Sequence, residues 1–154
     1  MNLEAIIQAM PDDLEIVVIG GIAAQRYIAS YVTNDFDVCY NATPANWQHI
    51  ITWFTPFTPS LWIAQQHRPL VWNTSTPMQD YTLMTQAGEI DLLQEVDGVG
   101  KYPQVKVLSV SAIIFGKTLW FLNLQGLITN KHAANRPKDL ILLRQLEDEQ
   151  RKGS

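Results

Sequence analysis

Two acidic residues, Asp35 and Asp37, alternate with the apolar residues Phe36 and Val38. Successive side chains of a β-strand point to opposite faces, so both carboxylates lie on one face while Phe36 and Val38 enter a core. The two carboxylates are then roughly 6–7 Å apart along the strand, and they can converge on two divalent cations about 3.5–4 Å apart. This spacing predicts metal-dependent transfer chemistry on a phosphate compound.

A second acidic pair, Glu89 and Asp91, follows Gly88 and alternates with Ile90 and Leu92. If this strand lies beside the first, Asp91 completes a three-carboxylate site. Hard oxygen ligands of this kind suit Mg²⁺, which also retains waters and substrate phosphates. The alternative is a half-exposed strand whose acidic side chains are merely solvated.

The Gly20-Gly21 pair follows an apolar strand at 15–19 and opens a helix at 22–29. Such a turn presents backbone N–H groups and the positive end of a helix dipole, and glycine lets an anion approach closely. It therefore predicts a phosphate cradle, although ordinary β–α turns also use glycine. A Walker loop and a dinucleotide fingerprint are both excluded, because neither Gly-Lys-Ser/Thr nor G-x-G-x-x-G is present.

Three cations, Lys131, Arg136 and Lys138, lie within eight residues near the end of the chain. Across a cleft from the carboxylates they would neutralise a triphosphate. Alternatively, they complement the dipoles of two successive helices, with Asp139 in the first turn of the second.

In this order, the blocks resemble the minimal nucleotidyltransferases of the DNA polymerase β superfamily, in particular the bacterial branch with the nucleotidyltransferase component of abortive-infection toxin–antitoxin pairs. The matching positions are Val17 to Ile19, Gly20, Gly21, Thr33, Asp35, Asp37, Gly88 to Leu93, Lys131, Ala133, Arg136, Lys138 and Asp139. Two departures stand out. Relatives often carry His-Gly and an arginine where this chain has Tyr27-Ile28 and Tyr31.

The resemblance implies a site that holds two Mg²⁺ ions and takes a nucleoside triphosphate as substrate. In it Asp35, Asp37 and Asp91 are the catalytic metal ligands. The nucleotide-binding residues are Gly20, Gly21, Thr33, Lys131 and Arg136. The expected activity is transfer of a nucleoside monophosphate to a hydroxyl of a small molecule, a protein or an RNA end, with release of pyrophosphate. The alternative is a non-catalytic nucleotide-binding or toxin–antitoxin-type interaction protein of the same fold.

The pattern along the chain predicts an α/β (α+β) fold, and the resemblance specifies a nucleotidyltransferase-like mixed twisted sheet flanked by helices, with helices at the C-terminus. One domain is expected over residues 1–150 and a disordered tail over 151–154. Helices are predicted at 3–10, 44–54, 124–134 and 137–149, and strands at 33–40, 81–85 and 89–96. Residues 105–110 and 117–122 are expected to form two further strands, or one strand and an irregular segment. The proline-rich segment 55–79 is expected to be loop with one short helix or strand near 61–66. Its Trp62 and Trp72 either stack on a base or, as tryptophans more often do, pack.

The amino-acid composition indicates which classes of partner and which cellular compartment to expect. The net charge of −4 gives no strong nucleic-acid signal, although eight of the eleven basic residues lie in the last third of the chain. The single cysteine, Cys39, excludes an intramolecular disulfide and fits a reducing compartment. No signal peptide or membrane span is expected, so a cytoplasmic protein is predicted, with a partner protein as one possible source of acceptor specificity.

Overall fold

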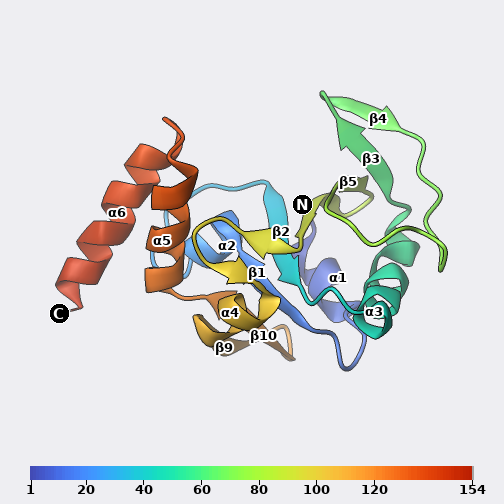
Figure 1. Cartoon of the computed structure of the whole chain (residues 1–154), viewed down its shortest axis with the longest axis horizontal. Helices are drawn as coiled ribbons and strands as arrows, with labels where there is room; N and C mark the ends of the chain where they lie inside the picture. The colour runs from blue at the N-terminus through green and yellow to red at the C-terminus, as the bar shows by residue number, and fades with distance from the viewer. Residues whose placement is uncertain (154) are drawn as a thin grey trace.

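The computed structural model describes residues 1–153, in which a mixed sheet is flanked by helices (Figure 1). The eight strands of this sheet run in the order β4-β3-β5-β6-β2-β1-β10-β9. Their bounds are β1 (Ile16–Ile19), β2 (Asp35–Tyr40), β3 (Ser60–Ile63), β4 (Gln66–Arg68), β5 (Tyr81–Thr85), β6 (Gly88–Leu93), β9 (Ser109–Ile114) and β10 (Lys117–Leu122). A separate two-stranded sheet pairs β7 (Glu95–Val96) with β8 (Gly100–Lys101). The expected fold class, α/β with a mixed sheet and C-terminal helices, is confirmed.

The helices occupy both ends of the molecule. They are α1 (Leu3–Gln8), α2 (Gly20–Ala24), α3 (Pro44–Phe54), the 3-10 turn η1 (Thr55–Phe57), α4 (Tyr102–Val107), α5 (Leu124–Ala134) and α6 (Asp139–Lys152). Helices α5 and α6 pack side by side at one end, and α1 and α3 lie toward the other (Figure 1). No helix in residues 1–153 has the length and apolar character needed to cross a membrane.

Two parallel pairings matter for the site. Strand β2 runs parallel to β6 and β1 runs parallel to β10, whereas the other pairs of the large sheet are antiparallel. All four residues of β1 are buried, as expected for a central strand covered on both faces. Strand β2 therefore lies between β1 and β6, and its acidic residues lie beside those of β6.

The core fixes β2 against the helices. Phe36 is fully buried and meets Trp53 of α3 edge-to-face, with ring centroids 6.0 Å apart. The indole Nε1 of Trp53 donates a hydrogen bond of 2.8 Å to the carbonyl of Ile6 in α1. Cys39 is fully buried as well and behaves as a small apolar side chain. The apolar half of the β2 alternation is thus anchored, which leaves its acidic half on the opposite face.

Local capping signals place several helices where the sequence predicts them. Thr43 accepts a hydrogen bond from the N–H of Asn46, and Pro44 occupies the first turn of α3. Asn123 caps α5 by accepting from the N–H of Gly126. The strands at 81–85 and 117–122 and the helix at 124–134 are confirmed with the predicted bounds.

The strand predicted at 105–110 is wrong. Residues 102–107 form α4, and β9 begins only at Ser109. The β-branched Val105 and Val107 favour a strand, but Pro103 lies in the first helical turn and the side chain of Gln104 accepts a hydrogen bond from the N–H of Lys101. Only Val105 is buried, whereas Val107 is 80% exposed. The helix-start signal therefore prevails over β propensity.

Three further bounds differ from prediction. The helix expected at 22–29 begins at Gly20 and ends at Ala24, because irregular turns follow it. Segment 55–79 contains the β3–β4 hairpin, two short strands where one short helix or strand was expected near 61–66. A disordered tail was expected over residues 151–154, but α6 extends through Lys152 and so includes the first two of them. Residue 154 lies outside the described residues.

Candidate metal and nucleotide site

Four carboxylates lie on one face of the parallel strands β2 and β6. Asp35 is opposite Glu89, and Asp37 is opposite Asp91. Carboxylate oxygens of Asp35, Glu89 and Asp91 lie within 4.8 Å of one another. Acidic and apolar residues alternate in the same register on both strands, and the apolar residues are buried on one face of the sheet, so the acidic residues share the other face. The sheet thus brings together the three predicted aspartates and adds Glu89.

Asp37 is the most perturbed member of this carboxylate cluster. Burial raises its pKa to about 8, with further increases from its hydrogen bond with Asp91 and from the charges of Asp91 and Asp35. Its Oδ1 atom is buried and has no hydrogen-bond partner in the described part of the chain. An unpartnered buried carboxylate oxygen beside other carboxylates is a strained arrangement without a cation and a suitable ligand for Mg²⁺.

Glu89 is also perturbed. Burial raises its pKa to about 7, and its contact with Asp35 and the charges of Asp35 and Asp91 contribute in the same direction. Both perturbed groups therefore hold protons more readily than a free carboxyl does, because they are buried and their neighbours are other carboxyls. A bound divalent cation would reverse this effect by favouring the ionised forms.

The two glycines allow the turn before α2 to approach the carboxylate strand. Gly20 has a φ of +63°, and a Cβ placed there would lie 2.2 Å from Oδ2 of Asp37. A Cβ on Gly21 would lie 2.5 Å from Oγ1 of Thr33. Contacts this short exclude any side chain at either position unless the neighbour moves. Both glycines are therefore needed to pack the turn against the acidic face.

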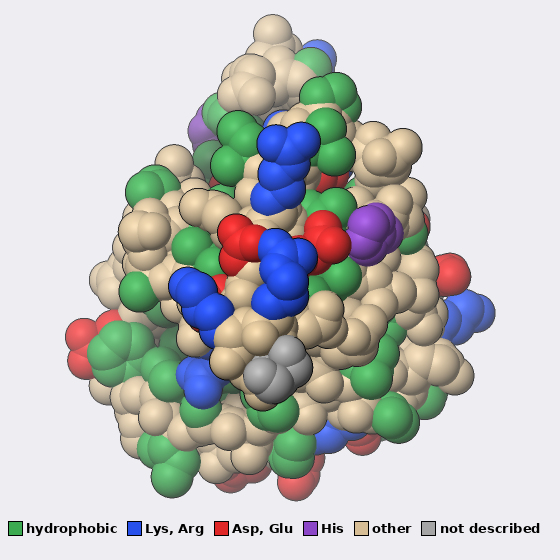
Figure 2. Space-filling model, turned by 90° about the vertical axis from the view of Figure 1, so that its left-hand side faces the viewer, with side chains coloured by type: hydrophobic (Ala, Val, Ile, Leu, Met, Phe, Trp, Pro, Cys, Tyr) green, Lys and Arg blue, Asp and Glu red, His purple; other side chains and the backbone are tan. Residues whose placement is uncertain are grey.

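A cavity of about 310 Å³ opens at this point. It is lined by Gly20, Gly21, Tyr31, Thr33, Asp35, Asp37, Asp91, Lys131, Arg136, Lys138 and Asp139. All eight residues predicted for the site are in this lining. Acidic and basic side chains gather in one area on the face of the molecule that carries α5 and α6 (Figure 2). Segments far apart in the sequence thus meet around one polar cavity.

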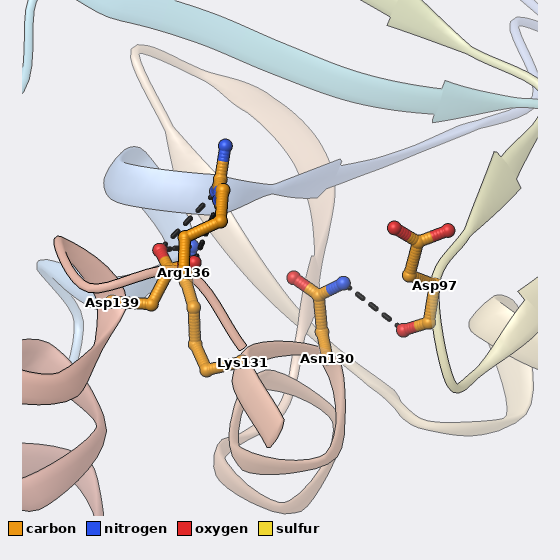
Figure 3. Close-up of polar contacts among 5 residues, drawn as sticks. All are labelled: Asp97, Asn130, Lys131, Arg136 and Asp139. Carbon is orange, nitrogen blue, oxygen red and sulfur yellow. Dashed lines mark hydrogen bonds and ion pairs between the residues drawn. The ribbon is translucent and has the colours of Figure 1, made fainter. Parts of the chain in front are cut away.

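The cations on the far side of the cavity are held by a buried carboxylate. Asp139, whose side chain is only 5% exposed, lies 3.3 Å from Nζ of Lys131 and 2.7 Å from Nε of Arg136 (Figure 3). Burial alone would raise the pKa of Asp139, but the Arg136 hydrogen bond and the Lys131 charge outweigh it and lower the pKa. The pKa of Arg136 is raised mainly by the same hydrogen bond.

This trio of Lys131, Arg136 and Asp139 carries one net positive charge. Lys131 is mostly buried, whereas the Arg136 side chain is 51% exposed and extends away from the helix (Figure 3). Asn130, one residue before Lys131, donates a hydrogen bond to the carbonyl of Asp97 and so ties α5 to the β7–β8 turn. The cations are thus fixed in place rather than distributed over a solvated surface.

The sequence does not assign a role in the site to three residues that lie in the cluster or the cavity lining, namely Glu89, Tyr31 and Asp139. Lys138, predicted from the sequence as a cation facing the carboxylates, is in the lining as well. The signal for Glu89 was available, since it precedes Asp91 by two residues just as Asp35 precedes Asp37. The role of Asp139 required knowing that α6 folds back on α5.

The two candidate tryptophans of segment 55–79 do not line the cavity. Trp72 packs against Trp47 and Tyr81, and its Nε1 donates a hydrogen bond of 3.0 Å to the carbonyl of Ile51. Trp62 lies on β3 against His67. The packing alternative therefore describes Trp72.

A scan against protein-family models finds no match for this chain, and a search of curated proteins finds none.

Proposed function

We propose that this protein is a Mg²⁺-dependent nucleotidyltransferase, which moves a nucleoside monophosphate from a nucleoside triphosphate to an acceptor hydroxyl and releases pyrophosphate. The observation that carries the proposal is the single cavity in which the carboxylates of β2 and β6 face the cations of α5 and its C-terminal turn across a glycine turn. Its resemblance to minimal polymerase-β-type nucleotidyltransferases rests on the same residues.

Charge balance favours a metal-loaded site. The four carboxylates carry four negative charges when ionised, and the Lys131–Arg136–Asp139 trio together with Lys138 offsets only two of them. A triphosphate would be repelled by this excess, so nucleotide binding requires divalent cations. Asp35, Asp37, Asp91 and Glu89 would hold Mg²⁺, which when bound activates an acceptor oxygen and neutralises charge on the leaving group.

The remaining groups of the cavity act on the nucleotide and the acceptor. Lys131 and Arg136 would bind phosphate oxygens, and Asp139 keeps both cations in position. A carboxylate of the cluster would accept the proton of the acceptor hydroxyl. Gly20 and Gly21 allow the nucleotide to approach the backbone. A cytoplasmic location and a partner protein that supplies the acceptor are parts of the same proposal.

The second candidate is a nucleotide-binding protein that does not catalyse transfer. Two observations favour it. Tyr31 lies in the cavity where relatives often have arginine, and Asp139 already engages both phosphate-binding cations. Binding without turnover in the experiment below would select this candidate.

The test is isothermal titration of the chain with Mg²⁺ and each nucleoside triphosphate, followed by incubation with α-labelled nucleotide and a cell extract. The variant Asp35→Asn/Asp37→Asn should lose Mg²⁺-dependent nucleotide binding and all labelling while remaining folded. Asp12→Asn/Asp13→Asn is the matched control, because it removes the same charge from exposed residues outside the cavity. Unchanged nucleotide affinity in the first variant would contradict the site.

A further inference from the structure

Tyr31 reaches the cavity from the loop that joins α2 to β2. The backbone of this residue is held on both sides. Its N–H donates a hydrogen bond of 3.0 Å to the carbonyl of Ile28, and its own carbonyl accepts one of 2.8 Å from Nε2 of Gln25. The ring is therefore presented to the cavity from a fixed position.

The hydroxyl of Tyr31 has no hydrogen-bond partner in residues 1–153. The other hydroxyl in the cavity lining belongs to Thr33, whose Oγ1 lies 3.4 Å from the N–H of Asp35. The buried tyrosines Tyr40 and Tyr81 both donate from Oη to backbone carbonyls, at 2.8 and 2.7 Å. Tyr31 thus differs from them by keeping an unused hydroxyl at the edge of an acidic site.

Charged residues of both the carboxylate cluster and the cationic trio act on the hydroxyl of Tyr31. Burial raises the pKa of Tyr31, and the charges of Asp139, Asp37 and Asp35 raise it further while Arg136 opposes them. Tyr31 therefore lines the same cavity as the carboxylate cluster and the cationic trio and is close enough to feel the charges of both, and this cavity is where a triphosphate would be held. An acceptor hydroxyl must occupy the same region.

We propose that Tyr31 is a site of self-nucleotidylylation, an inference that rests on the proposed transferase function. Oη of Tyr31 attacks the α-phosphorus of the bound nucleoside triphosphate, and an Oη–P bond forms. The bond between the α-phosphorus and the oxygen bridging to the β-phosphorus breaks, and pyrophosphate leaves. The phenolic proton passes to a carboxylate of the cluster. The product is a nucleoside monophosphate joined to the ring by a phosphodiester.

The product would limit its own formation. A nucleotide attached to Tyr31 fills the cavity that a second nucleoside triphosphate needs, so each chain accepts one nucleotide and then stops. Because the nucleoside triphosphate binds in the same chain that carries the acceptor tyrosine, the rate constant at saturating nucleotide should not depend on protein concentration. Modification would therefore switch off transfer to any external acceptor.

The experiment incubates the full chain with Mg²⁺ and each nucleoside triphosphate in turn and measures the intact mass. At least one nucleotide should add a single nucleoside monophosphate, and peptide mapping should place it on Tyr31. Label at the α-phosphate should be retained and label at the γ-phosphate lost. Tyr31→Phe should reduce labelling to background without lowering the melting temperature, because the hydroxyl has no internal partner. Tyr27→Phe, a control four residues away and outside the cavity lining, should be labelled like the wild type.

The outcomes separate this inference from the proposed function. Labelling of an extract acceptor by the wild-type chain, with no mass change on the chain itself, would overturn self-modification and leave the transferase intact. Label on another residue, or equal labelling of Tyr31→Phe, would also overturn it. Reduced nucleotide affinity in Tyr31→Phe with an unmodified wild type would show that the hydroxyl only donates a hydrogen bond to phosphate. Absence of both binding and transfer would refute the function itself.

Discussion

Replacing Asp37 by asparagine should stabilise the metal-free protein. Asp37 lies opposite Asp91, and its buried Oδ1 has no partner in the described residues. Asparagine keeps the shape of the side chain, removes the charge and supplies N–H donors to the neighbouring carboxylates. The substitution therefore removes the repulsion between Asp37 and the neighbouring carboxylates.

The size and pH dependence of this effect follow from the titration of Asp37. Its pKa is raised by burial and by Asp91 from 3.8 to about 8, so the folded protein binds more protons than the unfolded chain between these values. Stability is then highest below the unfolded pKa and falls as pH rises through the folded pKa. At about 1.4 kcal/mol for each tenfold change in proton affinity, the cost at pH 7 is at most about 4 kcal/mol.

Solvent and counter-ions at the open side of the cavity reduce this cost, and we expect about 2 kcal/mol at pH 7. For a chain of this length, that corresponds to a rise of roughly 4–8 °C in melting temperature. Thermal unfolding in a chelator, at pH 5 and at pH 8, measures it. The gap between Asp37→Asn and wild type should widen with pH, whereas Asp12→Asn should follow the wild type. A gap that is absent at pH 8, or that narrows with pH, would refute the reasoning.

Three other substitutions test separate parts of the site and its support. Gly20→Ala should destabilise the protein by about 2 kcal/mol more than Gly116→Ala in denaturant unfolding. Both glycines have positive φ, but an added Cβ would meet another atom only at Gly20. Equal losses of stability would show that this contact costs nothing. Glu89→Gln should weaken Mg²⁺ binding several-fold in titration calorimetry at pH 8, and unchanged affinity would remove Glu89 from the site. Trp72→Ala should lower the free energy of unfolding by about 3 kcal/mol, and Trp62→Ala by less than half as much. The reason is that only the Trp72 indole both packs on other rings and donates a hydrogen bond to the backbone. Equal losses of stability in the two variants would contradict this difference.

The sequence predicts the elements whose signals are local. Thr43 and Pro44 mark the start of α3, and the apolar alternation in β2 and β6 marks both acidic strands. The prediction fails at 105–110, where β-branched residues suggested a strand and local capping by Gln104 formed a helix. In this helix Val105 is buried and Val107, two residues on, is exposed, although the two valines would share a face in a strand.

The sequence predicts most of the residues that belong to the site, but it does not predict which charged side chains contact one another there. Each carboxylate could be placed on a face from its own strand, yet the pairing of Asp35 with Glu89 depends on β2 and β6 being parallel neighbours. Likewise, Lys131 and Asp139 meet only because α6 turns back along α5. Contacts of this kind depend on tertiary packing, which one-strand or one-helix patterns do not report.

The mutually repelling carboxylates of β2 and β6 and the cations Lys131 and Arg136 line the same cavity. Asp37 raises the energy of the metal-free protein, while Asp139 holds Lys131 and Arg136 in ion pairs, and the charge of Lys131 only partly offsets the rise in the pKa of Asp37. Any divalent cation that binds the cluster recovers the free energy lost to repulsion, so binding and stability are linked. The Asp37→Asn protein should then gain less thermal stability from Mg²⁺ than the wild type gains. A gain from Mg²⁺ in Asp37→Asn equal to that of the wild type would contradict this link between the repulsion at Asp37 and cation binding.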